Sequence, residues 1–191
     1  MKLIFGLLLF FSIISTNAYS QWSKLPGPAG GVFSDIERVG NEIWLSSISG
    51  LYISQNEGLT WHKSNLVDRY VHDVIAFNDT IVVLFATIDV NGNFNYKNKT
   101  ISSFNGGSSW QAPFLFNQGN LTGDKIFKSS KCLFIEMIGG YRQSFDGGLT
   151  WSTMSLYLSR LLSDSNMALG IDYSGNPDKY YFSEKGEHEC F

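Results

Sequence analysis

The sequence predicts an all-β chain assembled from repeated antiparallel units, and three observations carry that prediction. Aromatic residues make up 15% of the chain and glycines number 19, a composition that favours strands and turns over helices. One octapeptide recurs three times. Each copy follows short stretches in which apolar and polar residues alternate, which is the pattern of half-buried strands.

The first twenty residues are expected to form a signal peptide, outside the fold. Lys2 gives a positive start, residues 3–14 form an apolar run, and small residues stand at Ala18 and Ser20, where a signal peptidase reads. The run is shorter than the ~20 apolar residues that a membrane-spanning helix needs. We therefore expect residues 1–20 to be removed and residues 21–191 to form a secreted or periplasmic domain, with no integral membrane segment after signal removal.

The charge balance argues against nucleic acid as a partner. The chain has 14 Lys and Arg against 17 Asp and Glu, a net charge of -3, and no basic stripe that could neutralise phosphates.

The two cysteines leave two interpretations open. Export makes a disulfide between Cys132 and Cys190 chemically feasible. Cys132 also lies in the apolar run "CLFIEM", where a buried free thiol is common.

The octapeptide reads "SQNEGLTW" at 54–61, "SFNGGSSW" at 103–110 and "SFDGGLTW" at 144–151. All three copies share Ser, then Asn or Asp at the third position, Gly at the fifth, Ser or Thr at the seventh and a final Trp. Five shared positions in three copies indicate a true internal repeat. The shared residues are Ser54, Asn56, Gly58, Thr60, Trp61, Ser103, Asn105, Gly107, Ser109, Trp110, Ser144, Asp146, Gly148, Thr150 and Trp151.

The flanking sequences repeat as well. Two apolar, β-rich stretches precede each octapeptide, such as "VHDVIAF" and "TIVVLFATI" before the second, and a short stretch such as "TWSTM" follows. The polar segment "DVNGNFNYKN" fits a hairpin extension inserted in the second unit. We expect each octapeptide to join the third strand of its unit to a fourth.

The tryptophans set the period of the repeat. Trp61, Trp110 and Trp151 are 49 and 41 residues apart, Trp22 lies 39 residues before the first, and Phe191 lies 40 residues after the last. Four antiparallel strands in about 40 residues are typical of one blade of a β-propeller. The predicted blades span residues 32–63, 70–113, 124–154 and 157–191, with 21–25 as a candidate closing strand. About four blades form either a small closed ring or a partial propeller.

The octapeptide resembles the Asp-box, also called the BNR repeat, which occurs on β-propellers of sialidases, sortilin-type receptors, some glycoside hydrolases and photosystem assembly factors. The resemblance covers residues 22–191 and implies a propeller. It does not imply one function, because these proteins use the same architecture for many tasks.

The residues of the octapeptide suit a structural role. The Asn or Asp oxygen can accept backbone N–H groups in an Asx-type turn, the glycine supplies a positive φ, and the indole buries ~150–250 Å² beneath the loop. The third position is Asn56, Asn105 and Asp146, so two copies lack the carboxylate that a metal loop or a general base requires. We therefore predict no catalytic, cofactor or metal residues in the octapeptides, and no cofactor for the chain.

Other catalytic constellations are weakly supported. The histidines lack a metal-binding spacing, and the group around His188 fits a solvated tail. The sialidase resemblance implies three arginines around a substrate carboxylate, a Tyr nucleophile and an Arg-Ile-Pro motif, which is missing here. Acidic residues near the propeller axis could serve another glycosidase, but their spacing selects no pair. The histidines are His62, His72 and His188, and the arginines are Arg38, Arg69, Arg142 and Arg160. The acidic residues are Asp35, Asp73, Asp89 and Asp172.

Two functional hypotheses follow. The first is an exported propeller that acts as a binding or scaffold module for an unknown protein or glycan, through loops and aromatics such as Phe94 and Tyr96. The alternative is a glycan-active enzyme, either sialidase-like or another glycoside hydrolase, or a non-catalytic remnant of one. Residue usage and the "NAYSQW" junction favour a bacterial source.

Overall fold

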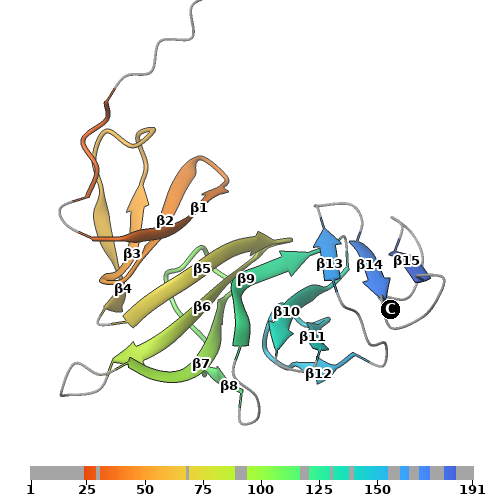
Figure 1. Ribbon diagram of the computed structural model, residues 1–191. Coiled ribbons are helices and arrows are strands. Elements are labelled where there is room, and N and C mark those ends of the chain that lie inside the picture. Colours follow the sequence, from red (N-terminus) through yellow and green to blue (C-terminus); the bar gives the residue numbers. More distant parts are fainter. Residues whose placement is uncertain are drawn as a thin grey trace, which may run out of the picture.

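A computed structural model describes residues 24–28, 31–67, 69–88, 94–116, 121–129, 131–137, 140–154, 160–163, 168–172 and 179–183. These residues form 15 β-strands in four antiparallel sheets (Figure 1). Over the same ranges there is no helix able to cross a membrane. The prediction of an all-β fold is confirmed.

Strands follow one another in sequence order within every sheet. The first sheet contains β1 (Phe33–Val39), β2 (Glu42–Ser47), β3 (Gly50–Ser54) and β4 (His62–Val67). The second contains β5 (Arg69–Phe77), β6 (Thr80–Ile88), β7 (Phe94–Ser103) and β8 (Phe114–Leu115). The third contains β9 (Leu121–Lys128), β10 (Leu133–Met137), β11 (Gly140–Ser144) and β12 (Ser152–Thr153). The described part of the fourth contains β13 (Arg160–Ser163), β14 (Ala168–Asp172) and β15 (Lys179–Ser183).

Neighbouring sheets contact each other through their first strands. Strand β1 lies against β5, β5 against β9, and β9 against β13 (Figure 1). The second and third sheets stand between the first and the fourth, which occupy opposite ends of the row. This succession of four-stranded antiparallel sheets around their inner strands is a β-propeller, as predicted.

Two hydrophobic cores join the first three sheets. Strand β6 serves both cores, because Val83 packs toward the first sheet and Val82 toward the third. Its sequence "TIVVLFATI" is almost continuously apolar, as expected for a strand that is covered on both faces.

Several sequence-based expectations fall at the margins of the described residues. Trp22 of the candidate closing strand lies outside them, and Leu25 lies beside Gly58 of the first sheet. Cys132 is buried and disulfide-bonded, while Cys190 lies outside the described residues. The side chains of Phe94 and Tyr96, and residues His188, Phe191 and Asp89, also lie outside.

Candidate functional site

The three octapeptides lie between the third and fourth strands of their sheets, and each begins with a buried serine. The serine oxygen accepts the backbone N–H of the glycine four residues on, at 2.9 Å in the first octapeptide and 2.8 Å in the other two. The same hydroxyl donates to the side-chain oxygen at the third position, at 3.1, 3.0 and 2.8 Å. The serines are Ser54, Ser103 and Ser144, and the glycines are Gly58, Gly107 and Gly148.

The third position closes the turn whether it carries an amide or a carboxylate. Oδ1 accepts the backbone N–H of the seventh residue at 2.8, 2.9 and 2.9 Å. In the first two copies the amide Nδ2 also donates to the seventh hydroxyl, and in the third copy the Thr150 hydroxyl donates to Asp146. Only the direction of this last bond differs, so the turn has no need of a charge.

The environment of Asp146 fits this role. Partial burial raises its pKa, but hydrogen bonds from Thr150 and Ser144 oppose burial and bring the pKa below its ordinary value. In the described part of the chain, no group of three or more His, Cys, Asp or Glu side chains is placed to hold a metal ion.

The glycine at the fifth position brings the second and third octapeptides against the preceding sheet. Gly107 has a φ of 81°, and a methyl group on it would lie 2.4 Å from the Trp44 ring of the first sheet. Gly148 has a φ of 84°, and a methyl group there would lie 2.9 Å from Val82 of the second sheet. A side chain at either position is excluded both by backbone conformation and by space.

The final tryptophan strengthens the contact with the preceding sheet. Trp151 Nε1 donates to Gly148 O at 3.1 Å and to Thr100 Oγ1 of the second sheet at 2.9 Å. Trp110 Nε1 donates to Asn65 Oδ1 of the first sheet at 2.8 Å. The second and third octapeptides therefore connect their own sheets to the sheet before.

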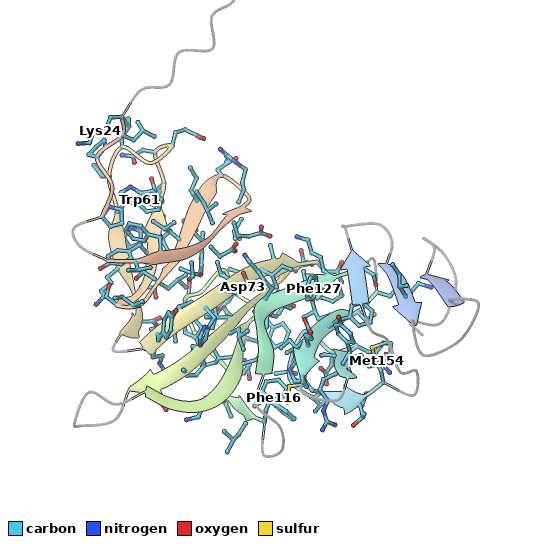
Figure 2. The ribbon with its side chains drawn as sticks, viewed as in Figure 1. Lys24, Trp61, Asp73, Phe116, Phe127 and Met154 are labelled. Carbon is cyan, nitrogen blue, oxygen red and sulfur yellow. The ribbon has the colours of Figure 1, made fainter. Side chains whose placement is uncertain are left out.

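A cluster of carboxylates and lysines lies where the inner strands of the first three sheets meet. Lys125 of β9 forms an ion pair with Asp35 of β1, and its Nζ lies 3.5 Å from Asp73 Oδ1 of β5. The other oxygen of Asp73 accepts the backbone N–H of Ile126 at 2.6 Å. Figure 2 shows Asp73 at this junction. Among the four acids named above, Asp35 and Asp73 are thus brought together.

Asp73 is the strongly perturbed group of this cluster. Burial, followed by the adjacent Asp35 carboxylate, raises the pKa of Asp73 to about 8. Partial burial lowers the pKa of Lys125, but Asp35 and Asp73 raise it by more. A carboxylic acid that keeps its proton at neutral pH has the protonation state of the general acid in a glycosidase. Here, however, Asp73 is only 3% exposed, and Lys125 contacts both carboxylates.

Beside this cluster, a second ion pair joins the same three sheets. Lys128 Nζ lies 3.0 Å from Glu37 Oε1 and donates to Ala76 O at 3.0 Å. The same Glu37 oxygen accepts the backbone N–H of Ala76 at 3.1 Å. Sequence reasoning missed Glu37, although its position two residues after Asp35 places both on one face of β1. The Asp172 side chain lies outside the described residues.

The described arginines do not converge on one site. Arg38 pairs with Glu57 at 2.7 Å on the surface, Arg69 stacks over the Phe85 ring, and Arg142 donates to Thr153. The Arg160 side chain lies outside the described residues. Of the described histidines, His62 is exposed and His72 is buried beside Tyr70.

A cavity of about 320 Å³ opens beside the third octapeptide. It contains the exposed ring of Phe145, the indole of Trp151 and the amide of Gln143, whose buried Oε1 has no hydrogen-bond partner. Its other lining residues are Asp146, Thr150 and Ser152. Aromatic walls with a few convergent polar groups are typical of small-molecule sites.

An exposed aromatic also stands at the second position of the neighbouring octapeptide. Phe104 is 47% exposed and Phe145 is 55% exposed. Ser102 Oγ donates to Gly147 O at 2.6 Å, so each phenylalanine lies two residues from this hydrogen bond. Exposed phenylalanines thus occupy the same position in two neighbouring octapeptides, and only Phe145 lines the cavity.

The sequence matches no protein-family model and no curated protein. Among solved structures, the chain is similar to an ancestral GH74 enzyme, with a TM-score of 0.55 and 16% identity over 82% of this chain. It is also similar to a mutant of the NanB sialidase from Streptococcus pneumoniae, with a TM-score of 0.46 and 14% identity over 90% of this chain and 32% of that one. A thermostable family-43 glycoside hydrolase gives a TM-score of 0.43 and 14% identity over 83% of this chain and 71% of that one.

The chain spans 25% of the length of the GH74 structure. At this low identity, the similarity shows the β-propeller fold alone.

Proposed function

We propose that this protein is an exported β-propeller module that binds a carbohydrate in the cavity beside the third octapeptide, without hydrolysing it. In this proposal the octapeptides are Asp-box hairpins whose fifteen shared residues have a structural role, and three of them, Asp146, Thr150 and Trp151, also line the cavity. The signal-peptide pattern of residues 1–20 supports a secreted or periplasmic, bacterial location.

The exposed ring of Phe145 in the wall of this cavity carries the proposal. An exposed ring offers an apolar surface to the C–H face of a sugar. The Asp146 carboxylate and two hydroxyls supply hydrogen-bonding groups. An apolar surface combined with several acceptors fits a sugar better than a hydrocarbon or a phosphate.

The inner carboxylate pair supports a structural role over hydrolysis. A glycosidase pair must reach both sides of a glycosidic bond. Asp73 instead accepts a backbone hydrogen bond, and Lys125 occupies the space beside both carboxyl groups. The alternative, a sialidase-like or other glycan-active enzyme or its remnant, draws support from the raised pKa of Asp73.

A glycan array probed with the mature protein tests the proposal, followed by titration of the best oligosaccharide. We expect Phe145→Ala to weaken binding at least about tenfold, which corresponds to about 1.4 kcal/mol. Phe104→Ala is the matched control, because this exposed phenylalanine occupies the same octapeptide position and does not line the cavity. An array without binders, or equal affinity for wild type and Phe145→Ala, contradicts carbohydrate binding here.

Product analysis on the bound oligosaccharide separates binding from catalysis. The proposal predicts that the oligosaccharide is recovered intact after prolonged incubation. Turnover that Asp73→Asn or Asp35→Asn abolishes establishes the hydrolase alternative instead.

A further inference from the structure

The first sheet has one face that no other described sheet covers, and much of it is apolar. Two charged residues also belong to this face, because Arg38 is aligned with Ile43 and Lys63 with Tyr52. Trp44, on the opposite face, is fully buried in the core shared with the second sheet. The uncovered face, called the end face below, has Ile36 aligned with Leu45 and Leu45 aligned with Tyr52 across three strands. Ile43 completes it, two residues before Leu45. Ile36 is 62% exposed, and the other three are half-buried.

The register shows what kind of surface the end face is. The strand residue paired with the octapeptide serine is Ile43 in the first sheet and Ile81 in the second, so these two correspond. Two residues further along the same strands, Leu45 corresponds to Val83. Through the next strand pair, Ile36 corresponds to Val74. Val74 is 1% exposed because the first sheet covers it. The end face therefore occupies the positions that a preceding sheet covers elsewhere in the molecule.

The third sheet follows the same rule. By the same register, Leu133, Ile135 and Ile126 occupy these positions, and all three are buried against the second sheet. Two of the three comparable faces are thus covered by a sheet of the same propeller.

The first octapeptide gives independent support. Gly107 and Gly148 contact side chains of a preceding sheet, whereas Gly58 faces Leu25, with its added methyl 3.3 Å from Leu25 Cδ1. Leu59, the next residue, is 56% exposed. The first octapeptide has the same internal hydrogen bonds as the other two, but no described sheet precedes its own.

We propose that the fourth sheet of a second copy covers the end face, so that two chains associate head to tail. The fourth sheet stands at the opposite end of the row (Figure 1). Its register aligns Leu162 with Leu169 and Phe182, and Leu161 with Gly170 and Tyr181, so apolar residues occur in both alternating rows. A sheet with apolar residues in both rows is expected to pack on both sides.

The number of described sheets is compatible with closure of this arrangement. The described residues of two copies contain eight sheets, within the range of about four to eight blades found in propellers. A head-to-tail contact that closes after two copies has two-fold symmetry and leaves no end face exposed. Both ends of the row are then covered by the same interface.

Light scattering coupled to size-exclusion chromatography tests the proposal on the full mature chain. We expect twice the monomer mass for wild type and the monomer mass for Ile36→Glu, with unchanged circular dichroism. Leu115→Glu is the control, because Leu115 is 36% exposed on β8, away from the end face, and the variant should stay dimeric. A monomeric wild type, or Ile36→Glu that remains dimeric, overturns the proposal.

A second pair of variants tests the head-to-tail geometry. Tyr180 and Tyr181 are consecutive residues of β15, and consecutive residues of a strand belong to opposite faces of its sheet. We expect glutamate at one of these positions to give a folded monomer. If the Tyr180→Glu variant and the Tyr181→Glu variant are each folded dimers, the fourth sheet is not the partner surface and the arrangement is overturned.

Discussion

The buried carboxyl group of Asp73 accepts the backbone N–H of Ile126 at 2.6 Å, and this hydrogen bond joins the inner strands of the second and third sheets. Asp35 approaches from the first sheet and Lys125 from the third. One cluster of side chains thus connects three sheets through their first strands. Because Asp73 titrates, the connection should depend on pH.

Stability should fall as pH rises from about 4 to about 8. The unfolded carboxyl ionises near a pKa of about 3.9, whereas burial raises the pKa of folded Asp73 to about 8. The folded state holds the extra proton between these values, so its stabilising effect is complete below the lower pKa and is lost through the upper one. Urea unfolding across this pH range should show a loss of roughly a few kcal/mol.

Asp73→Asn should remove most of that pH dependence, because the amide keeps an acceptor for Ile126 and cannot ionise. Asp79→Asn, at an exposed turn, is the control and should keep the wild-type profile. If the stability of Asp73→Asn depends on pH as that of wild type does, the role of Asp73 in connecting the sheets is contradicted.

The two asparagine copies predict that the carboxylate of Asp146 is dispensable for folding. Asp146→Asn should change the free energy of unfolding at pH 7 by less than about 0.5 kcal/mol, whereas Asp146→Ala removes the acceptor for Thr150 N and should cost about 1–2 kcal/mol. Thermal unfolding of both variants measures this difference.

The stability of wild type and Asp146→Asn should also differ in its dependence on acidic pH. The pKa of Asp146 is lowered, so its stabilising effect is present above the unfolded value of about 3.9 and is lost as pH falls through the folded value. Asp146→Asn should lack this loss. Equal stability of the Asn and Ala variants would mean that the third position does not organise the turn.

The disulfide of Cys132 should contribute measurably to stability. The chain has two cysteines, and none of the described cysteines is free. Thiol titration of the denatured, unreduced protein should therefore find no free thiols. Reduction should lower the free energy of unfolding by about 2–4 kcal/mol. Two titratable thiols before reduction would contradict the bonded state.

The repeated pattern predicted the fold because each of its signals is local. The octapeptide "SFDGGLTW" contains its own serine, acceptor and glycine, so three copies were enough to locate three turns and the sheets around them. The long apolar run of β6 likewise indicated a strand buried on both faces.

The meeting of Asp35 and Asp73 could not be predicted in this way. They lie on inner strands of different sheets, and their separation depends on how the sheets pack rather than on residue spacing. The cavity beside Phe145 escaped prediction for a similar reason. It combines Gln143 of β11 with the octapeptide and β12, and the pattern treats Gln143 as an ordinary strand residue.

The central claim is that the second and third octapeptides each hold their own sheet against the preceding one, and two adjacent glycines allow a direct test. Gly106 and Gly107 both have positive φ values, 66° and 81°. A methyl group on Gly106 meets nothing within 4 Å, whereas one on Gly107 meets the Trp44 ring at 2.4 Å. Both alanine variants share a backbone strain of about 1–2 kcal/mol, and only Gly107→Ala also forces the sheets apart.

The decisive measurement is the difference in unfolding free energy between Gly107→Ala and Gly106→Ala, in wild type and in a Trp44→Leu background. We expect Gly107→Ala to be about 1–3 kcal/mol less stable than Gly106→Ala in wild type. In the Trp44→Leu background, where the ring is gone, that difference should largely disappear. Equal losses at both glycines in wild type, or an undiminished difference without the ring, would contradict the claim.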